Sequence, residues 1–110
     1  MRIMRMLVMF DLPTGNKSER RSYADFRKFL IKDGYHMEQF SVYSRVLLSR
    51  DSADAHLKRL EANLPLAGAV TVLTLTEKQY EGREVLVDHR PRMEHIADPG
   101  PQLTLSFEVV

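Results

Sequence analysis

The sequence places one acidic side chain where a buried strand is expected to end. Residues 6–10 form an unbroken apolar run, Asp11 follows it, and Pro13 then prevents further strand pairing. Side chains alternate between the two faces of a strand, so Asp11 is expected on the face of Leu7 and Met9. A carboxylate at the rim of a sheet lies close to whatever covers that face. Asp11 is therefore the first candidate for chemistry, although an aspartate before Leu-Pro is also a common turn residue.

Basic residues are expected to lie near this carboxylate. Six of them fall between residues 17 and 32, and the first turns of the helix predicted there carry Lys17, Arg20 and Arg21. A helix that follows a strand through a short loop begins at the same rim of the sheet. The arrangement places a carboxylate beside a cationic helix end, although a solvated basic face is the simpler interpretation.

The helix itself is predicted from local signals. Asn16 and Glu19 have the spacing of a capping box, and Gly34 is a typical left-handed stop, so the helix is expected to end near residue 32 or 33. Its apolar stripe includes Phe26 and Leu30, which recur at helical spacing. We expect this stripe to pack on the sheet, with the basic residues on the opposite side and along its edge.

Other reactive side chains have no supporting pattern. Ser41 and Ser44 lack a visible base partner, which disfavours a serine nucleophile. No metal-binding spacing relates the four histidines, which are His36, His56, His89 and His95. The chain contains no cysteine, which excludes disulfides and thiolate chemistry and fits a reducing compartment.

The remaining segments predict further strands and a second helix. Residues 35–48 are rich in aromatic and β-branched residues and predict one long, half-exposed strand. A second helix is expected from a cap at Asp51 or Ser52 to Pro65. Its apolar residues recur at helical spacing: Ala53, Leu57, Leu60 and Leu64. Residues 69–76 predict a third strand with apolar groups on both faces, residues 77–82 one helical turn or a tight loop, and residues 84–88 a short fourth strand.

This order of elements predicts an α+β fold. The natural packing is a ferredoxin-like β-α-β-α-β sandwich, in which an antiparallel sheet carries both helices on one face. The other face would then be bare, yet the first and third strands are apolar on both sides. We therefore expect a face-to-face homodimer with Asp11 of each chain near the interface.

A change of composition divides the chain. Proline and glycine become frequent after residue 88, and residues 103–110 then alternate apolar and polar side chains. We predict a ferredoxin-like domain over residues 1–88, a linker over 89–102, and an extra C-terminal strand over 103–110. This strand is expected to pair with its own sheet or with the sheet of a partner.

Length and composition exclude several classes of protein. A chain of 110 residues with 44% hydrophobic residues has room for one domain with an ordinary core. The net charge of +1 neither favours nor excludes nucleic acid. No secretory signal is visible, and no apolar run approaches the roughly 20 residues of a membrane span. The sequence predicts a soluble, cytoplasmic protein with no membrane partner.

Five short motifs, taken in order, resemble a known family. They are Asp-Leu-Pro at 11–13, Lys-Ser-Glu-Arg-Arg at 17–21, Phe-Arg-Lys-Phe-Leu at 26–30, Gln-Phe-Ser-Val-Tyr-Ser at 39–44 and Leu-Thr-Leu-Thr-Glu-Lys-Gln-Tyr at 73–80. The chain resembles the small CRISPR-associated adaptation nuclease, a ferredoxin-like homodimer that bridges two dimers of the spacer integrase. The resemblance covers about residues 1–80 and is greatest for members that accompany type II systems.

The resemblance implies an endonuclease that requires Mg²⁺ or Mn²⁺ and acts on single-stranded RNA or double-stranded DNA. It implies that Asp11 is the catalytic residue and the metal ligand, with two copies of the chain bringing two carboxylates together. It further implies nucleic-acid contacts from five side chains, which are Arg20, Arg21, Arg27, Phe40 and Ser41. In many members of the family the nuclease activity is dispensable for spacer acquisition.

Three alternatives remain open at the level of sequence. The first is a non-catalytic, DNA-binding scaffold of the integration complex, in which Asp11 serves only a turn. The second is a related ribonuclease toxin of the same fold. The third, an RNA-recognition or regulatory domain, is disfavoured because residues 69–76 carry none of the aromatics that such a sheet displays.

Overall fold

The computed structural model describes residues 3–90 as four strands and three helices. In chain order they are β1 (Met4–Asp11), α1 (Lys17–Lys32), β2 (His36–Gln39), β3 (Val42–Leu47), α2 (Arg50–Glu61), β4 (Ala69–Thr76) and α3 (Glu77–Glu81). The strands form one antiparallel sheet in the order β2-β3-β1-β4. The predicted strand at 103–110 and most of the predicted linker at 89–102 lie outside the described residues.

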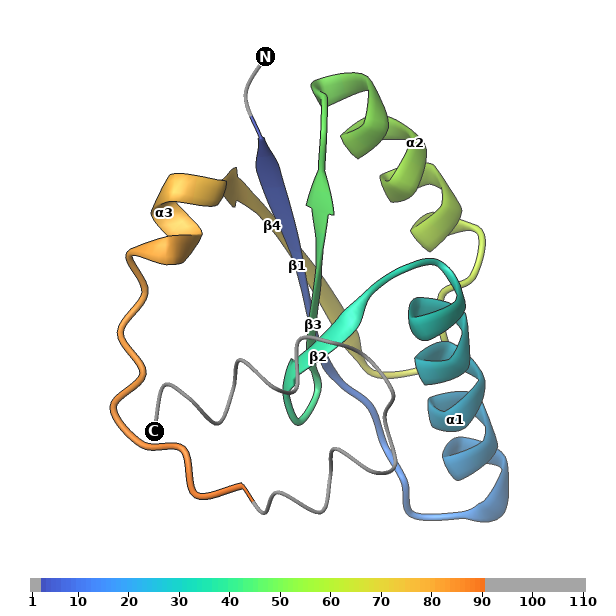
Figure 1. The fold of residues 1–110 in the computed structure, drawn as a ribbon. Coiled ribbons are helices and arrows are strands. Elements are labelled where there is room, and N and C mark those ends of the chain that lie inside the picture. Colours follow the sequence, from blue (N-terminus) through green and yellow to red (C-terminus); the bar gives the residue numbers. More distant parts are fainter. Residues whose placement is uncertain (1–2, 91–110) are drawn as a thin grey trace.

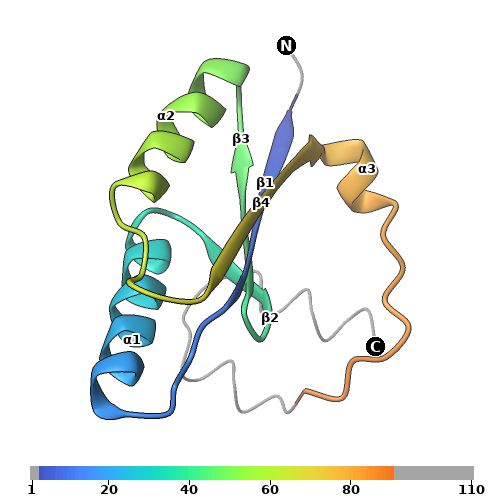
Figure 2. The same ribbon diagram turned by 180° about the vertical axis from the view of Figure 1, so that it is seen from behind.

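The two long helices cover one face of the sheet, and α3 lies on the other side (Figure 1). The same arrangement is visible from behind (Figure 2). This α+β architecture is consistent with the predicted ferredoxin-like fold. We call the face that α1 and α2 leave uncovered the open face.

The prediction of one long strand over residues 35–48 is wrong. The segment is a hairpin of β2 and β3, joined by a two-residue turn at Phe40 and Ser41. Ser41, the second residue of the turn, adopts a positive φ of 65°, a backbone conformation that turns usually obtain from glycine or asparagine. The turn therefore carries no strong sequence signal. With the extra strand the element order becomes β-α-β-β-α-β rather than the predicted β-α-β-α-β.

Two further boundaries differ from prediction. The cap of α2 is Ser49, whose Oγ accepts a hydrogen bond from the Ser52 amide at 3.1 Å, and the helix ends at Glu61, before Pro65. Residues 84–88 are described but form no strand with any described segment. The Val85–Val87 stretch has the β-branched composition of a strand, yet a strand also requires a neighbouring edge.

The start of α1 and the identity of α3 are confirmed. Asn16 caps α1, because its side chain accepts from the Glu19 amide at 2.8 Å, and Gly34 ends the segment at a φ of 96°. The predicted helical turn at 77–82 is α3, capped by Thr76 in a complete capping box with Gln79. Both helices are specified by local side-chain chemistry.

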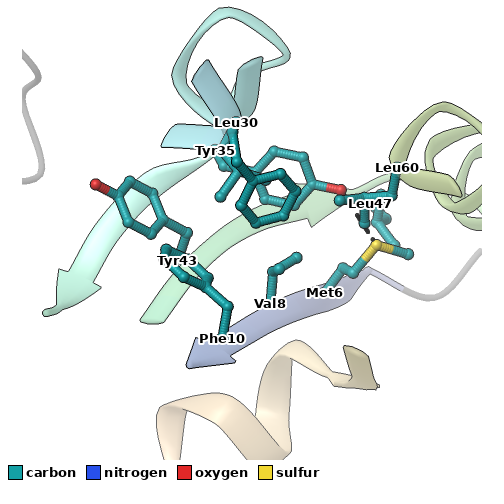
Figure 3. Close-up of a cluster of buried hydrophobic side chains, with 9 residues drawn as sticks. Met6, Val8, Phe10, Leu30, Tyr35, Tyr43, Leu47 and Leu60 are labelled. Atoms are coloured by element: carbon teal, nitrogen blue, oxygen red, sulfur yellow. Dashed lines mark hydrogen bonds between the residues drawn. The ribbon is translucent and has the colours of Figure 1, made fainter. Parts of the chain in front are cut away.

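The core lies between the sheet and the helices α1 and α2. Alternate residues of β1, which are Met6, Val8 and Phe10, point into it, and their neighbours there include Leu30, Tyr35, Tyr43, Leu47 and Leu60 (Figure 3). Burial of an apolar side chain of this size contributes about 2 kcal/mol to folding. The core of the domain is thus complete on one face of the sheet.

The helices are too short or too polar to cross a bilayer, in the part of the chain that the structure describes.

Candidate functional site

Asp11 is the last residue of β1, and its side chain is exposed on the open face together with those of Leu7 and Met9. This is the face on which strand alternation predicted it. No hydrogen bond or ion pair holds its carboxylate among residues 3–90. The carboxylate is therefore available to a ligand.

The backbone at Asp11 is held by the turn that precedes β4. Asp11 is paired with Ala69 in the sheet, and Gly68 has a φ of 96°. A Cβ atom at Gly68 would lie 2.5 Å from the carbonyl oxygen of Asp11. Only glycine fits this close approach, so the turn fixes the end of β1 and the carboxylate that it carries.

The hairpin turn lies at the same end of the sheet. The amide of Phe10 donates to the carbonyl oxygen of Ser41 at 3.0 Å, so the turn is fixed directly beside Asp11. The Phe40 ring is 78% exposed, with its centroid 6.2 Å from that of Tyr23. Tyr23 in turn contacts Phe10 at 5.9 Å. A row of aromatic rings thus runs from the core to an exposed ring at the surface.

The arginines of α1 divide into two groups. Arg20, Tyr23 and Arg27 share one side of the helix by their spacing, and this side faces the hairpin. Arg27 Nε donates to the Tyr43 hydroxyl at 2.7 Å, and Arg20 Nη1 lies 3.4 Å from the carbonyl oxygen of Thr14. Arg21 lies on another side, where it lines a groove of about 320 Å³ beside the α2–β4 loop.

The structure therefore brings some of the predicted site residues together and separates others. Asp11, Phe40 and Ser41 share one end of the sheet, and the N-terminal half of α1 begins there. Arg20 and Arg27 are on the helix-covered side of that end, whereas the Asp11 carboxylate is on the open face. Arg21 faces away from both.

A polar cluster at the opposite end of the open face was missed by the sequence reasoning. It is centred on Arg5, which is only 7% exposed although it is charged. Its members are Arg5 of β1, Glu38 of β2, Ser44 of β3, and Glu77 and Tyr80 of α3. The sequence signals were an arginine at the start of an apolar strand and polar residues within a β pattern. We call this set the Arg5 cluster.

Hydrogen bonds determine the charge state of Glu38 in this cluster. Burial alone would raise the pKa of Glu38, but hydrogen bonds from His36, Ser44 and Tyr80 outweigh it and lower the pKa to about 2. The Tyr80 hydroxyl donates to Glu38 at 2.6 Å, and burial together with this bond raises the pKa of Tyr80. Glu38 is therefore a carboxylate at neutral pH and is held by donors, so it is not available to a substrate.

The side chains of one chain do not complete a metal site within residues 3–90. No group of three or more His, Asp or Glu residues there could hold an ion. His56, which is buried, contacts Asp33 at 3.2 Å, and His36 contacts Glu38 at 3.3 Å. The hard oxygen donor of Asp11 suits Mg²⁺ or Mn²⁺ chemically, but it is one ligand where such ions take about six.

Comparisons with known proteins identify relatives of this chain. A family model described as CRISPR associated protein Cas2 matches residues 4–83. A protein named CRISPR-associated endoribonuclease Cas2 from Acidovorax ebreus (strain TPSY) is 57% identical over 84 residues, covering 76% of this chain and 82% of the relative. A protein of the same name from Streptococcus mutans serotype c (strain ATCC 700610 / UA159) is 51% identical over 77 residues, covering 70% and 71%. Another from Treponema denticola is 46% identical over 84 residues, covering 76% and 83%. The family match spans every strand and helix described above.

Proposed function

The chain belongs to the CRISPR-associated Cas2 family, as its motifs predicted, and from this we propose that it is an endoribonuclease of CRISPR adaptation with Asp11 in its active site. The observation that carries the proposal is the position of Asp11. Its carboxylate is exposed, lacks a partner among the described residues, and stands at a fixed strand end. A carboxylate that only closed a turn would be expected to accept hydrogen bonds from that turn.

The proposed active unit is a homodimer formed through the open face. Leu73 of β4 is 52% exposed there and is paired with Leu7, and Val85–Val87 add further exposed apolar side chains beyond α3. A monomer leaves these groups in water, whereas a second copy would bury them. Two copies would also supply two Asp11 carboxylates, where the described residues of one chain supply a single free carboxylate at this strand end.

Mg²⁺ or Mn²⁺ bound by the paired Asp11 carboxylates would polarise a phosphodiester and supply a nucleophilic water. The protein contributes the positions of the groups around it. Gly68 and the Phe10–Ser41 hydrogen bond fix the two sides of the strand end. In this proposal Arg20 and Arg27 contact phosphates of a strand that passes over the hairpin end, and the exposed ring of Phe40 contacts a base. Arg21 would contact a different part of the nucleic acid.

The proposal extends to the partners that the sequence resemblance implied. The dimer would bridge dimers of the CRISPR integrase and bind double-stranded DNA during spacer acquisition, while single-stranded RNA remains the first substrate to test. The runner-up is a non-catalytic scaffold of the integration complex. The observation that favours it is that no group of three or more His, Asp or Glu residues within the described residues 3–90 could hold an ion.

The deciding experiment compares the wild type with Asp11→Asn. Labelled single-stranded RNA and linear double-stranded DNA are incubated with each protein in Mg²⁺, Mn²⁺ or chelator. We expect metal-dependent cutting by the wild type and a loss of at least about 100-fold in the variant, because the metal loses its protein ligands.

The matched control is Asp54→Asn, an exposed aspartate of α2 far from the strand end. It should cut at the wild-type rate, and light scattering should give the same mass for all three proteins. Equal cutting by wild type and Asp11→Asn, or cutting that survives chelation, would contradict the catalytic role and leave the scaffold.

A further inference from the structure

Tyr43 of β3 is a core residue that carries a hydroxyl to the edge of the core. Its side chain is 1% exposed, and its ring stacks on that of Phe10 with the centroids 5.8 Å apart. In Figure 3 the hydroxyl points away from the other labelled core side chains. Packing therefore fixes the ring, and the hydroxyl is a polar atom held at a set place beside α1.

The Tyr43 hydroxyl accepts a hydrogen bond from Arg27 of α1. The Arg27 Nε atom lies 2.7 Å from the hydroxyl oxygen. The Arg27 side chain is exposed, and no other hydrogen bond or ion pair holds it among residues 3–90. A guanidinium bound through Nε keeps the N–H groups of both terminal nitrogens for another acceptor. Arg27 is therefore anchored at one nitrogen and available to a ligand at the other two.

Such an anchor favours a phosphate contact. Arginine commonly binds a phosphate through two parallel hydrogen bonds, which require one orientation of the planar group. A free arginine side chain loses rotamer freedom when it takes that orientation, and the loss weakens binding. Arg20, by comparison, lies 3.4 Å from a backbone carbonyl oxygen through Nη1, a terminal nitrogen. The anchor of Arg27 leaves its two terminal nitrogens together, whereas the contact of Arg20 occupies one of them.

The same anchor connects Arg27 to the strand end that carries Asp11. Tyr43 is paired with β1 and lies two residues after Ser41 in the chain. The carbonyl oxygen of Ser41 accepts from the amide of Phe10, the residue before Asp11. The position of the Arg27 guanidinium is thus set by the sheet as well as by the helix.

We propose that Tyr43 is a positioning residue for nucleic acid, whose hydroxyl holds Arg27 by Nε so that the two terminal nitrogens form a prepared bidentate site for one backbone phosphate. The inference rests on the Arg27–phosphate contact of the proposed function. It adds the buried group that orients this contact, a role for which the ring of a phenylalanine would not suffice.

The test is a double-mutant cycle on RNA binding. The affinity for a labelled single-stranded RNA is measured in chelator, so that binding is followed without cutting. We expect Arg27→Ala to weaken binding about 10-fold or more, because a charged contact is lost. Tyr43→Phe, which removes one oxygen atom and keeps the ring, should weaken binding about fivefold, since Arg27 must then be ordered by the RNA. In the Arg27→Ala background Tyr43→Phe should have no further effect.

Tyr35→Phe is the matched control. Tyr35 is 3% exposed, and its hydroxyl donates to the sulfur atom of Met6 at 3.3 Å in another part of the core. The change removes the same atom from a different buried ring and should leave the affinity unchanged. Arg27→Lys tests the inference without altering the core, because lysine keeps the charge but cannot make a bidentate contact. It should bind the RNA less tightly than the wild type.

The outcomes separate this inference from the proposed function. If Arg27→Ala weakens binding but Tyr43→Phe does not, or if the two effects add, the positioning role is overturned while the phosphate contact stands. An Arg27→Lys protein with wild-type affinity would also overturn the positioning role, since charge alone would suffice. An Arg27→Ala protein with unchanged affinity would overturn the proposed phosphate contact and the positioning role together. The cutting assay on Asp11→Asn is decided independently of these measurements.

Discussion

At the scale of single residues, Glu38 makes part of the stability depend on pH. Its pKa is lowered to about 2 in the folded chain by hydrogen bonds from His36, Ser44 and Tyr80, against the opposing effect of burial. A group with a lowered folded pKa stabilises the fold above its unfolded pKa, near 4.5, and loses this contribution as the pH falls toward 2. The lowered pKa of Glu38 corresponds to a contribution of at most about 3 kcal/mol to the free energy of unfolding.

We therefore predict that the difference in unfolding free energy between wild type and Glu38→Gln is largest at about pH 7 and narrows by about pH 3. Urea denaturation at the two pH values measures it. The control Glu81→Gln changes an exposed carboxyl and should give a small difference at both values. A Glu38→Gln difference that stays constant with pH would contradict the assignment of the charge to Glu38.

The position of Asp11 could be predicted from the sequence, whereas the Arg5 cluster could not. Asp11 follows from strand alternation and a neighbouring proline, which are local properties. The donors to Glu38 come from β2, β3 and α3, and Tyr80 is 42 positions away along the chain. Without the strand pairing, a glutamate within a predicted strand indicates only that its side chain has a polar environment. The role of Asp11 in catalysis and the contacts of Arg20, Arg21, Arg27, Phe40 and Ser41 with nucleic acid stay predictions.

At the scale of elements, the turn before β4 determines the position of Asp11. Gly68→Ala places a methyl group 2.5 Å from the carbonyl oxygen of Asp11 at a φ that alanine disfavours. We expect a loss of about 2 kcal/mol in unfolding free energy, together with reduced cutting because the strand end is displaced.

Gly82→Ala provides the comparison for this substitution. Gly82 has a φ of −77°, and an added Cβ would lie no closer than 3.5 Å to its neighbours, so the change should be tolerated. Urea denaturation and the RNA-cutting assay report on both variants. Equal stability of the two proteins would mean that the Gly68 turn can relax, contrary to the fixed strand end described above.

The elements that were predicted correctly carry their signals within a few residues. The capping residues of α1 and α3 and the helical spacing of Phe26 and Leu30 are of this kind. The β2–β3 turn has no glycine or asparagine, and a serine takes the positive φ, so the turn carries no local sequence signal. For residues 84–88 the local signal is present but the strand is not. Their composition favours a strand, yet the described part of the chain provides no sheet edge with which they pair.

At the scale of the whole molecule, association is predicted to depend on the exposed apolar side chains of the open face. Leu73→Glu places a charge there beside Leu7, where a second copy would have to bury it. We expect a monomer by light scattering, with an unchanged circular dichroism spectrum because Leu73 is half exposed in the single chain.

Thr74→Glu is its matched control, because Thr74 is the next residue of β4, points to the opposite face and is exposed. It should leave the mass of the assembly unchanged. A Leu73→Glu protein that keeps the mass of a dimer would show that the open face is not the contact surface.

The layered α+β architecture could be predicted because β1 and β4 carry apolar side chains on both faces, so each face of the sheet needs a layer that packs against it. The sequence identifies only one of these two layers, the helices α1 and α2. The position of α3 on the open face depends on charged groups from distant segments, such as Arg5 and Glu77, and became apparent only with the fold.

The alternation of side chains along β1 has a consequence for how this molecule can evolve. Met6, Val8 and Phe10 build the core, so a substitution of one of them changes the stability of the fold. Leu7, Met9 and Asp11, one position away in each case, face outward. A substitution in the second set leaves the core intact, so the surface that the chain presents can change while the fold is kept.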